Sequence, residues 1–175
     1  MKKVIFASIA VLFIVGFFSL PVLANDRDTL VRFKGGIGVI PVSNVTVAGT
    51  PPVVTVSPNI VRGVNPAGQI WVIDKLDARV KTNGDIKVNG KGLILGGGNN
   101  AGRATGQSVI ATLICDPAGV TPHNTTLAGV PLSTEGDFKI DDVLTPIPVG
   151  GCASPMLLIR NAANLGWFAV GILDD

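Results

Sequence analysis

Apolar and polar side chains alternate along much of this chain. Residues 76–81 are the clearest case, because every second side chain is apolar and the side chains between them are charged. A period of two places the apolar side chains on one face of a β-strand. Gly and Pro interrupt the pattern every few residues, and Val, Ile and Thr fill the intervals, which predicts short strands joined by turns. The expected strands cover residues 29–33, 39–42, 53–56, 70–73, 76–81, 86–95, 108–115, 127–132, 138–143, 156–160 and 167–172.

This rhythm predicts an all-β fold. A strand about every dozen residues is the spacing of β-sandwiches. We therefore expect a single antiparallel β-sandwich, immunoglobulin-like or transthyretin-like, over residues 25–175. The prolines and glycines of residues 35–66 favour edge strands and extended coil in the first third of that domain.

Two nine-residue segments, 81–89 and 133–141, resemble each other and predict two β-hairpins. Cross-strand parity requires a three-residue loop in each, with Gly84 and Gly136 at positive φ. The similarity fades outside these segments, which favours a recurrent turn over a duplication. The predicted cross-strand pairs are Val80 with Ile86 and Ala78 with Val88, then Leu132 with Phe138 and Val130 with Ile140.

The first 24 residues have the pattern of a secretory signal peptide. Two lysines precede an uncharged, apolar run over residues 4–20, and Val22 and Ala24 occupy the −3 and −1 positions of a cleavage site. A retained membrane anchor is the alternative, but a span needs about 20 apolar residues and this run is shorter. Because Asn25 rather than Cys follows, a lipid anchor is not indicated. We expect cleavage, and a secreted or periplasmic protein without a membrane span.

Removal of that segment changes the charge balance. The whole chain has 14 basic and 12 acidic side chains, and its two signal-peptide lysines account for the difference. A neutral mature protein gives no reason to expect nucleic acid or an anionic membrane as partner. Residues 62–103 are mainly basic and residues 104–175 mainly acidic. A dipolar surface is one interpretation, and mixing of the charges by strand pairing is the one we favour.

Cys115 and Cys152 are the only cysteines. In an oxidising compartment two thiols most simply pair with each other, which predicts a structural disulfide. A redox-active pair would require the close C-x-x-C spacing, which this sequence lacks.

The order of features over residues 107–160 carries a resemblance to known modules. A strand ends in Cys115, a Gly-Asp-Phe hairpin follows at Gly136, and Cys152 precedes the apolar strand 156–160. This layout resembles transthyretin-like and pollen-allergen-like β-sandwich modules, and small secreted bacterial proteins with the same order. The resemblance implies a sandwich and no particular activity.

Candidate chemistry is sparse. Residues 96–101 match G-x-G-x-x-A, but a glycine-rich stretch follows where a dinucleotide site needs a helix, so we expect a flexible loop and no cofactor. His123 is the single histidine and is expected in a solvated loop. No Ser lies in a G-x-S-x-G elbow. We predict no catalytic residues.

Three further groups were weighed as ligand sites. Calcium binding is one interpretation of an acidic cluster, although no EF-hand-type loop is present and a solvated sheet edge is favoured. Trp71 and Trp167 have apolar neighbours, which favours packing over a sugar-stacking platform. Asn44 and Asn124 head glycosylation sequons that matter only in a glycosylating host. The acidic cluster comprises Glu135, Asp137, Asp141 and Asp142.

The sequence therefore predicts an exported, non-catalytic β-sandwich protein that acts as a binding or structural module of the cell envelope or extracellular space. A carbohydrate-binding module that uses Trp71 or Trp167 is the first alternative, and a small exported hydrolase that uses His123 is the second. Its partner is not indicated, but edge strands leave self-association open.

Overall fold

The computed structural model describes residues 28–118 and 121–174, and the expected signal peptide lies outside these ranges. The predicted all-β class is confirmed, since these residues form thirteen strands. In the described part of the chain no helix is long and apolar enough to cross a membrane.

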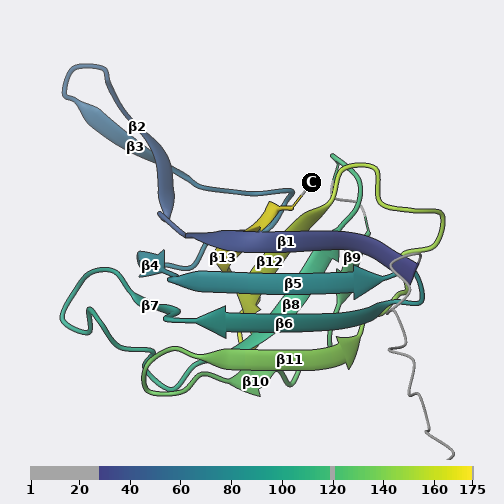
Figure 1. The fold of residues 1–175 in the computed structure, drawn as a ribbon. Helices are drawn as coiled ribbons and strands as arrows, with labels where there is room; N and C mark the ends of the chain where they lie inside the picture. Colours follow the sequence, from purple (N-terminus) through teal and green to yellow (C-terminus); the bar gives the residue numbers. More distant parts are fainter. Residues whose placement is uncertain (1–27, 119–120, 175) are drawn as a thin grey trace, which may run out of the picture.

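One antiparallel sheet forms the body of the molecule, with strand order β10-β8-β12-β13-β1-β5-β6-β11 and β9 paired to β8 (Figure 1). Two short ribbons, β2–β3 and β4–β7, lie outside this sheet. The strands are β1 Thr29–Gly38, β2 Val42–Ala48, β3 Val53–Pro58, β4 Trp71–Val72, β5 Lys75–Lys81, β6 Asp85–Lys91, β7 Ile94–Leu95, β8 Ser108–Ile114, β9 Pro122–Asn124, β10 Val130–Pro131, β11 Phe138–Val143, β12 Met156–Asn161 and β13 Trp167–Leu173.

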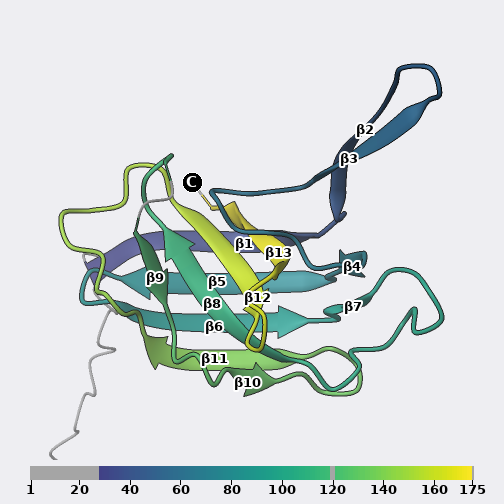
Figure 2. The same cartoon turned by 180° about the vertical axis from the view of Figure 1, so that it is seen from behind.

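The sheet curls into two facing layers. Strands β1, β5, β6 and β11 form the front layer, and β8, β12 and β13 cross behind them (Figures 1 and 2). The layers are continuous through the pairing of β1 with β13, so they are not two separately hydrogen-bonded sheets. Asn124 and Thr145 exchange backbone hydrogen bonds of 2.9 and 2.8 Å, which join β9 to the segment after β11. We call this junction between the two layers the seam.

The core lies between these layers, and its burial pattern differs between front and back. Strands β5 and β6 alternate buried and solvent-facing residues, as a sheet with one wet face requires. In β8 every residue after Ser108 is buried. A strap over residues 59–70 runs along β13, where Trp167 bonds to Asn65 and Ala67. Its valines Val61 and Val64 pack against the core, which adds a further layer of chain behind the sheet.

The first predicted hairpin has the expected register. Val80 pairs with Ile86 and Ala78 with Val88 across β5 and β6. Gly84 has φ +88°, a conformation that only glycine adopts at little cost.

The second hairpin forms its turn but not its predicted ladder. The Ser133 N–H donates to the Asp137 carbonyl, and Gly136 has φ +84°. However, Val130 pairs with Val109 of β8, and β11 pairs with β6. The predicted pairing of Val130 with Ile140 is therefore wrong. Cross-strand parity fits either partner, and the turn leads from the back layer to the front layer instead of joining neighbouring strands.

The two similar segments meet in the front layer around a local two-fold relation. Val88 pairs with Ile140 at its centre, and Lys87–Asp141 and Asn89–Lys139 flank this pair symmetrically. The two turns take part as well, since Gly84 and Gly136 each accept a hydrogen bond just beyond the end of the other segment's strand. The two similar segments therefore pair with each other, through β6 and β11.

Three other strand predictions need correction. Of the expected strand 39–42, residues 39–41 form no strand, although Val39 is fully buried. Val42 is instead the first residue of β2. The expected strand 86–95 divides at Gly92, which has φ +64°, into β6 and β7. Only Val130–Pro131 of the expected strand 127–132 pairs. The short strand β9 was not predicted.

Candidate functional site

Cations gather on the outward face of the front layer. Antiparallel pairing brings alternate residues of four strands into rows that cross the sheet. Lys81 of this face forms an ion pair with Asp85 at 3.2 Å, and we call the seven other cations the basic face: Arg32, Lys34, Lys75, Arg79, Lys87, Lys91 and Lys139. One row contains Arg32, Arg79, Lys87 and Asp141, the next Lys34, Asp77, Asn89 and Lys139, and the third Lys75 and Lys91.

Several like charges are direct cross-strand neighbours on this face. Arg79 lies opposite both Arg32 and Lys87, and Lys75 lies opposite Lys91. Like charges in directly opposed positions destabilise a sheet. In two of the three rows, therefore, the pairing of like charges does not itself stabilise the sheet.

A shallow groove of about 590 Å³ follows the first two rows. Three carboxylates accompany its cations. Asp141 forms an ion pair with Lys87, in which Oδ2 and Nζ are 3.0 Å apart, and both side chains are exposed. Asp77 lies beside Lys34, and Asp174 borders the groove, where its N–H donates to the Arg32 carbonyl. Among the described residues, the three rows hold seven cations, and the carboxylates beside them are these three and Asp137, which lies near Lys91.

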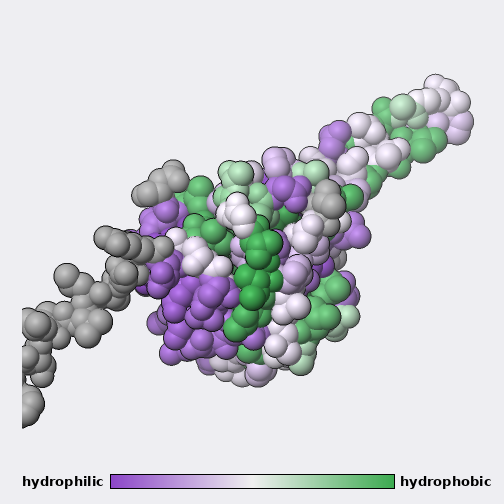
Figure 3. Space-filling model, turned by 90° about the vertical axis from the view of Figure 1, so that its right-hand side faces the viewer, coloured by the Kyte–Doolittle hydropathy of each residue, from purple (hydrophilic) through white to green (hydrophobic). Residues whose placement is uncertain are grey.

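Strand pairing mixes the charges only in part, because β11 of the acidic segment places Asp141 opposite Lys87 of β6. The basic segment 62–103 contributes two adjacent strands, β5 and β6, and their cations point to the same side. In Figure 3 hydrophilic side chains gather on one side of the body. A sequence segment rich in cations thus becomes a surface because its two strands are hairpin neighbours.

The two tryptophans are buried. Trp71 is 4 % exposed and stacks on Phe168 with ring centroids 4.0 Å apart. Trp167 is 3 % exposed and its indole Nε1–H donates to the Asn59 carbonyl at 3.0 Å. Neither ring presents a stacking face to solvent.

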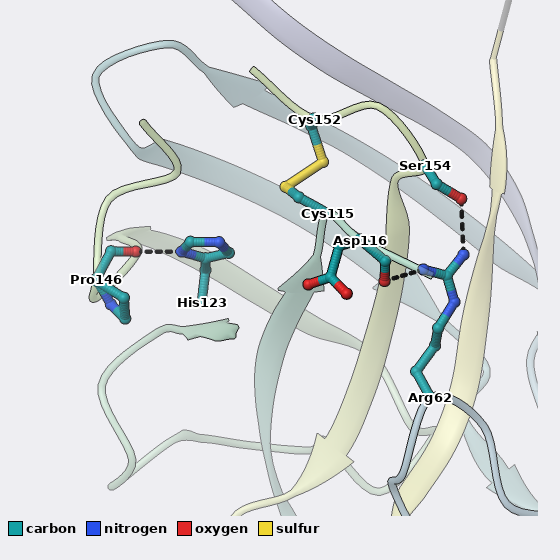
Figure 4. The surroundings of a disulfide bond; sticks show 7 residues. All are labelled: Arg62, Cys115, Asp116, His123, Pro146, Cys152 and Ser154. Atoms are coloured by element: carbon teal, nitrogen blue, oxygen red, sulfur yellow. Dashed lines mark hydrogen bonds between the residues drawn. A yellow bond between two sulfur atoms is a disulfide. The ribbon is translucent and has the colours of Figure 1, made fainter. Parts of the chain in front are cut away.

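The predicted disulfide between Cys115 and Cys152 is confirmed. It joins the chain after β8 to the loop before β12, with Cα atoms 4.5 Å apart (Figure 4). Arg62 of the strap strengthens this region by donating to the Asp116 carbonyl and to the Ser154 hydroxyl.

His123 is not the solvated loop residue that we expected. It lies on β9 and is 7 % exposed. Its Nδ1 lies 2.6 Å from the Pro146 carbonyl oxygen, as Figure 4 shows. A catalytic histidine needs access to substrate and an orienting partner. The His123 ring is buried, and one of its two nitrogens contacts a backbone carbonyl. The burial arises because the closing seam covers β9, which sequence periodicity did not reveal.

The acidic cluster does not converge. Within residues 28–118 and 121–174, no three His, Cys, Asp or Glu side chains form a group that could hold a metal ion. The Thr134 hydroxyl bonds to Glu135 at 2.7 Å and lowers the pKa of that carboxyl. Burial raises the pKa of Asp142, but N–H donors from Thr126 and Val143, each at 2.7 Å, outweigh it and hold the pKa below its usual value.

The remaining candidates lie apart from the basic face. The glycine-rich residues 96–98 follow β7 in a turn, and no helix follows them. Asn44 is exposed on β2. Asn124 is half-buried on β9 and accepts a hydrogen bond from Thr112 at 2.7 Å.

A second surface, which sequence reasoning missed, is the ribbon β2–β3. It projects away from the body, and we call its residues 42–58 the arm (Figures 1 and 2). Nearly every arm residue is exposed. The missed signal was the absence of any charged residue between Lys34 and Arg62, which is unusual for strands that face water on both sides.

Comparison with known proteins finds no match, since no family model, no curated protein and no solved structure is similar to this chain. The resemblance of residues 107–160 to transthyretin-like and pollen-allergen-like modules therefore stays a prediction.

Proposed function

We propose that this protein is an exported, non-catalytic binding module that holds anionic polymers of the cell envelope or extracellular space on its basic face. The observation that carries the proposal is the set of seven cations in three adjoining rows, with like charges directly opposed. The disulfide is compatible with an oxidising compartment such as the periplasm or the extracellular space.

The arrangement of the cations favours a polymer over a single small anion. Neighbouring strands are about 4.8 Å apart, and alternate residues along a strand are about 7 Å apart. The basic face therefore offers charges at a regular spacing over several strands, which suits a chain with repeated phosphate, sulfate or carboxylate groups. A buried cage for one anion would instead need donors that converge on one point.

The composition of the face indicates recognition by charge. Lysine and arginine head groups, with Asn89 among them, make up the rows, and no aromatic side chain belongs to them. Stacking on aromatic rings is the usual means of holding unpaired bases and sugar rings. We therefore expect binding that depends steeply on salt and little on the identity of the polymer backbone.

The alternatives find less support. The carbohydrate-binding alternative relied on Trp71 or Trp167, and both rings are buried. The hydrolase alternative relied on His123, which is buried against a backbone carbonyl. Neither alternative has a described surface comparable to the basic face.

The test is a titration of the disulfide-intact protein with a sulfated polysaccharide, dextran sulfate, at several salt concentrations. Neutralising two directly opposed cations in Lys75→Gln/Lys91→Gln should weaken binding at low salt by about tenfold or more, since each lost contact to a polyanion removes part of a charge-driven affinity. The variant should also show a shallower dependence on salt.

Arg103→Gln is the matched control, because Arg103 is an exposed cation outside the basic face. It should bind like the wild type. Absence of dextran sulfate binding at low salt would refute the proposal. Equal losses in the Arg103 control and the paired-lysine variant would also refute it, because they would show attraction to positive charge anywhere on the molecule.

A further inference from the structure

The arm combines an absence of charge with exposure on both of its faces. Residues 35–61 contain no charged side chain. Pro51 and Pro52 lie at the tip, and Pro58 closes β3, so the paired segments contain no proline before that end. Proteins usually protect exposed strand edges with charges, proline or bulges. The arm has a bulge only near its root, between Val42 and Asn44.

Strand register sorts the arm into two unlike faces. Val47 pairs with Val54 and Val45 with Val56, so these four side chains share one face, which we call the valine face. They are 54–63 % exposed. The opposite face is mixed, and it carries Asn44, Thr46, Ala48, Val53, Thr55 and Ser57.

An isolated two-stranded ribbon with an uncovered apolar face is only marginally stable in water. This ribbon is nevertheless held firmly at its root. The Asn59 N–H donates to the Pro41 carbonyl at 2.8 Å, and the Asn59 carbonyl accepts the Trp167 indole N–H from the core. The Ser43 hydroxyl donates across to the Pro58 carbonyl at 3.1 Å. These contacts fix the root of the arm, which projects from the body (Figure 3).

We propose that the arm binds the arm of a second copy of this chain, valine face against valine face. The valine face is self-complementary. It has no charge that needs an opposite partner, and two copies related by a two-fold axis would set flat valine pairs against each other at the usual distance of stacked sheets, about 10 Å. With 14 basic and 12 acidic side chains in the whole chain, the copies carry little net charge to repel each other.

Lipid is a poorer occupant of this surface. A two-stranded ribbon leaves its outer N–H and C=O groups unpaired, and these are costly in the hydrocarbon of a bilayer. The arm also contains neither the Trp or Tyr side chains nor the Lys or Arg side chains that anchor proteins at membrane interfaces. An arm pair in water leaves the outer edges hydrated and removes only the valine face from solvent.

Adjacent residues of the arm supply a matched pair of variants. Val53 and Val54 are 63 and 61 % exposed and lie on opposite faces. Val54→Lys would place one lysine from each copy within the proposed interface, whereas Val53→Lys adds the same charge to the mixed face. Sedimentation velocity over a concentration series measures the dimer dissociation constant of each.

The wild type should form a dimer, Val53→Lys should keep it, and Val54→Lys should raise the dissociation constant by more than about 100-fold, because the buried lysines lack partners. Near-ultraviolet circular dichroism of the buried tryptophans should be the same in all three proteins. A monomeric wild type well above micromolar concentration would overturn the proposal. A dimer that survives Val54→Lys, or binding of the wild-type arm to uncharged phosphatidylcholine vesicles, would also overturn it.

The two surfaces are tested separately. Loss of dimerisation in Val54→Lys does not depend on the basic face, which lies on β1, β5, β6 and β11. Likewise, dextran sulfate binding by the basic face does not require the arm.

Discussion

The β2–β3 and β5–β6 hairpins have the same secondary structure and opposite surroundings. In β5–β6 the apolar side chains alternate with charges, and each apolar side chain points into the core. In β2–β3 the four valines of the valine face lie on one side of the ribbon and are exposed to solvent. The first hairpin is stabilised by burial, whereas the second retains an apolar face that no described residue covers. This contrast is the basis of our proposal that the arm, unlike the body, makes its apolar contacts with a second copy.

Of the changes considered, removal of the disulfide should lower the free energy of unfolding of the body the most. Cys115→Ala/Cys152→Ala should lower the free energy of unfolding by about 4 kcal/mol, because the bond restricts a long loop in the unfolded chain. Hydrogen exchange should then become faster throughout β8 and β12. In samples dilute enough to be monomeric, amides of the arm should exchange rapidly in both proteins, since an exposed ribbon opens locally. Strong protection of the arm in a monomeric sample would break the contrast.

Truncation of a core side chain should follow in size. Leu158 is fully buried on β12, and Leu158→Ala should cost about 3 kcal/mol through lost burial and the cavity left behind. Val47→Ala in the arm should change the same quantity by less than about 0.5 kcal/mol. Urea denaturation at low protein concentration, where the arm is unpaired, compares them. Similar losses for both would show that the arm folds cooperatively with the sheet.

Three turn glycines sharpen the contrast further, because they share a positive φ and differ in surroundings. A Cβ on Gly136 would lie 2.3 Å from the Leu93 carbonyl oxygen, one on Gly84 would lie 3.1 Å from a side-chain carbon of Ile147, and one on Gly49 of the arm would meet only the Pro51 carbonyl oxygen at 3.5 Å. Alanine should therefore cost more than about 2 kcal/mol at Gly136, about 1 kcal/mol at Gly84 and nothing measurable in global stability at Gly49. Thermal unfolding of the three variants tests this order, and equal shifts would contradict it.

A smaller, pH-dependent effect is expected at the seam. The Asp142 carboxylate accepts N–H groups from Thr126 and Val143, and its pKa is lowered in the folded protein. A lowered folded-state pKa means that ionised Asp142 stabilises the fold above its unfolded pKa, and that this contribution is lost as the pH falls through the folded value. Asp142→Asn should cost about 1 kcal/mol at pH 7. The difference from wild type should shrink as the pH falls below the unfolded-state pKa and vanish below the lower folded-state pKa, and a difference that persists in that acid range would contradict the assignment.

Much of the sheet could be predicted from local pattern. Alternation in residues 76–81 and the positive-φ requirement at Gly84 are local properties, and both the strand and its register follow from them. The partner of Val130 could not be predicted, because the alternating strand β11 and the continuously apolar strand β8 both offer apolar side chains at matching positions. The burial of His123 depends on the closing of the sheet at Asn124 and Thr145, which is a contact distant in sequence.

The two surfaces were predictable to different degrees. Charge counts revealed the basic segment 62–103, but only pairing shows whether its cations share a face. The projecting arm was not predicted, because the prolines and glycines of residues 35–66 indicated only edge strands and extended coil. Hydrophobicity alone cannot distinguish a strand buried in the core from an exposed strand that binds another protein.

The most direct test of the central claim is the affinity of one short sulfated oligosaccharide for two variants, compared with the wild type at low salt. Lys75→Gln/Lys91→Gln alters only the basic face, and Val54→Thr alters only the valine face while keeping size and charge. We predict that the lysine variant binds about tenfold or more weakly and that Val54→Thr binds like the wild type. Equal affinity of all three proteins, or an equal loss in Val54→Thr, would contradict the assignment of ligand binding to the basic face.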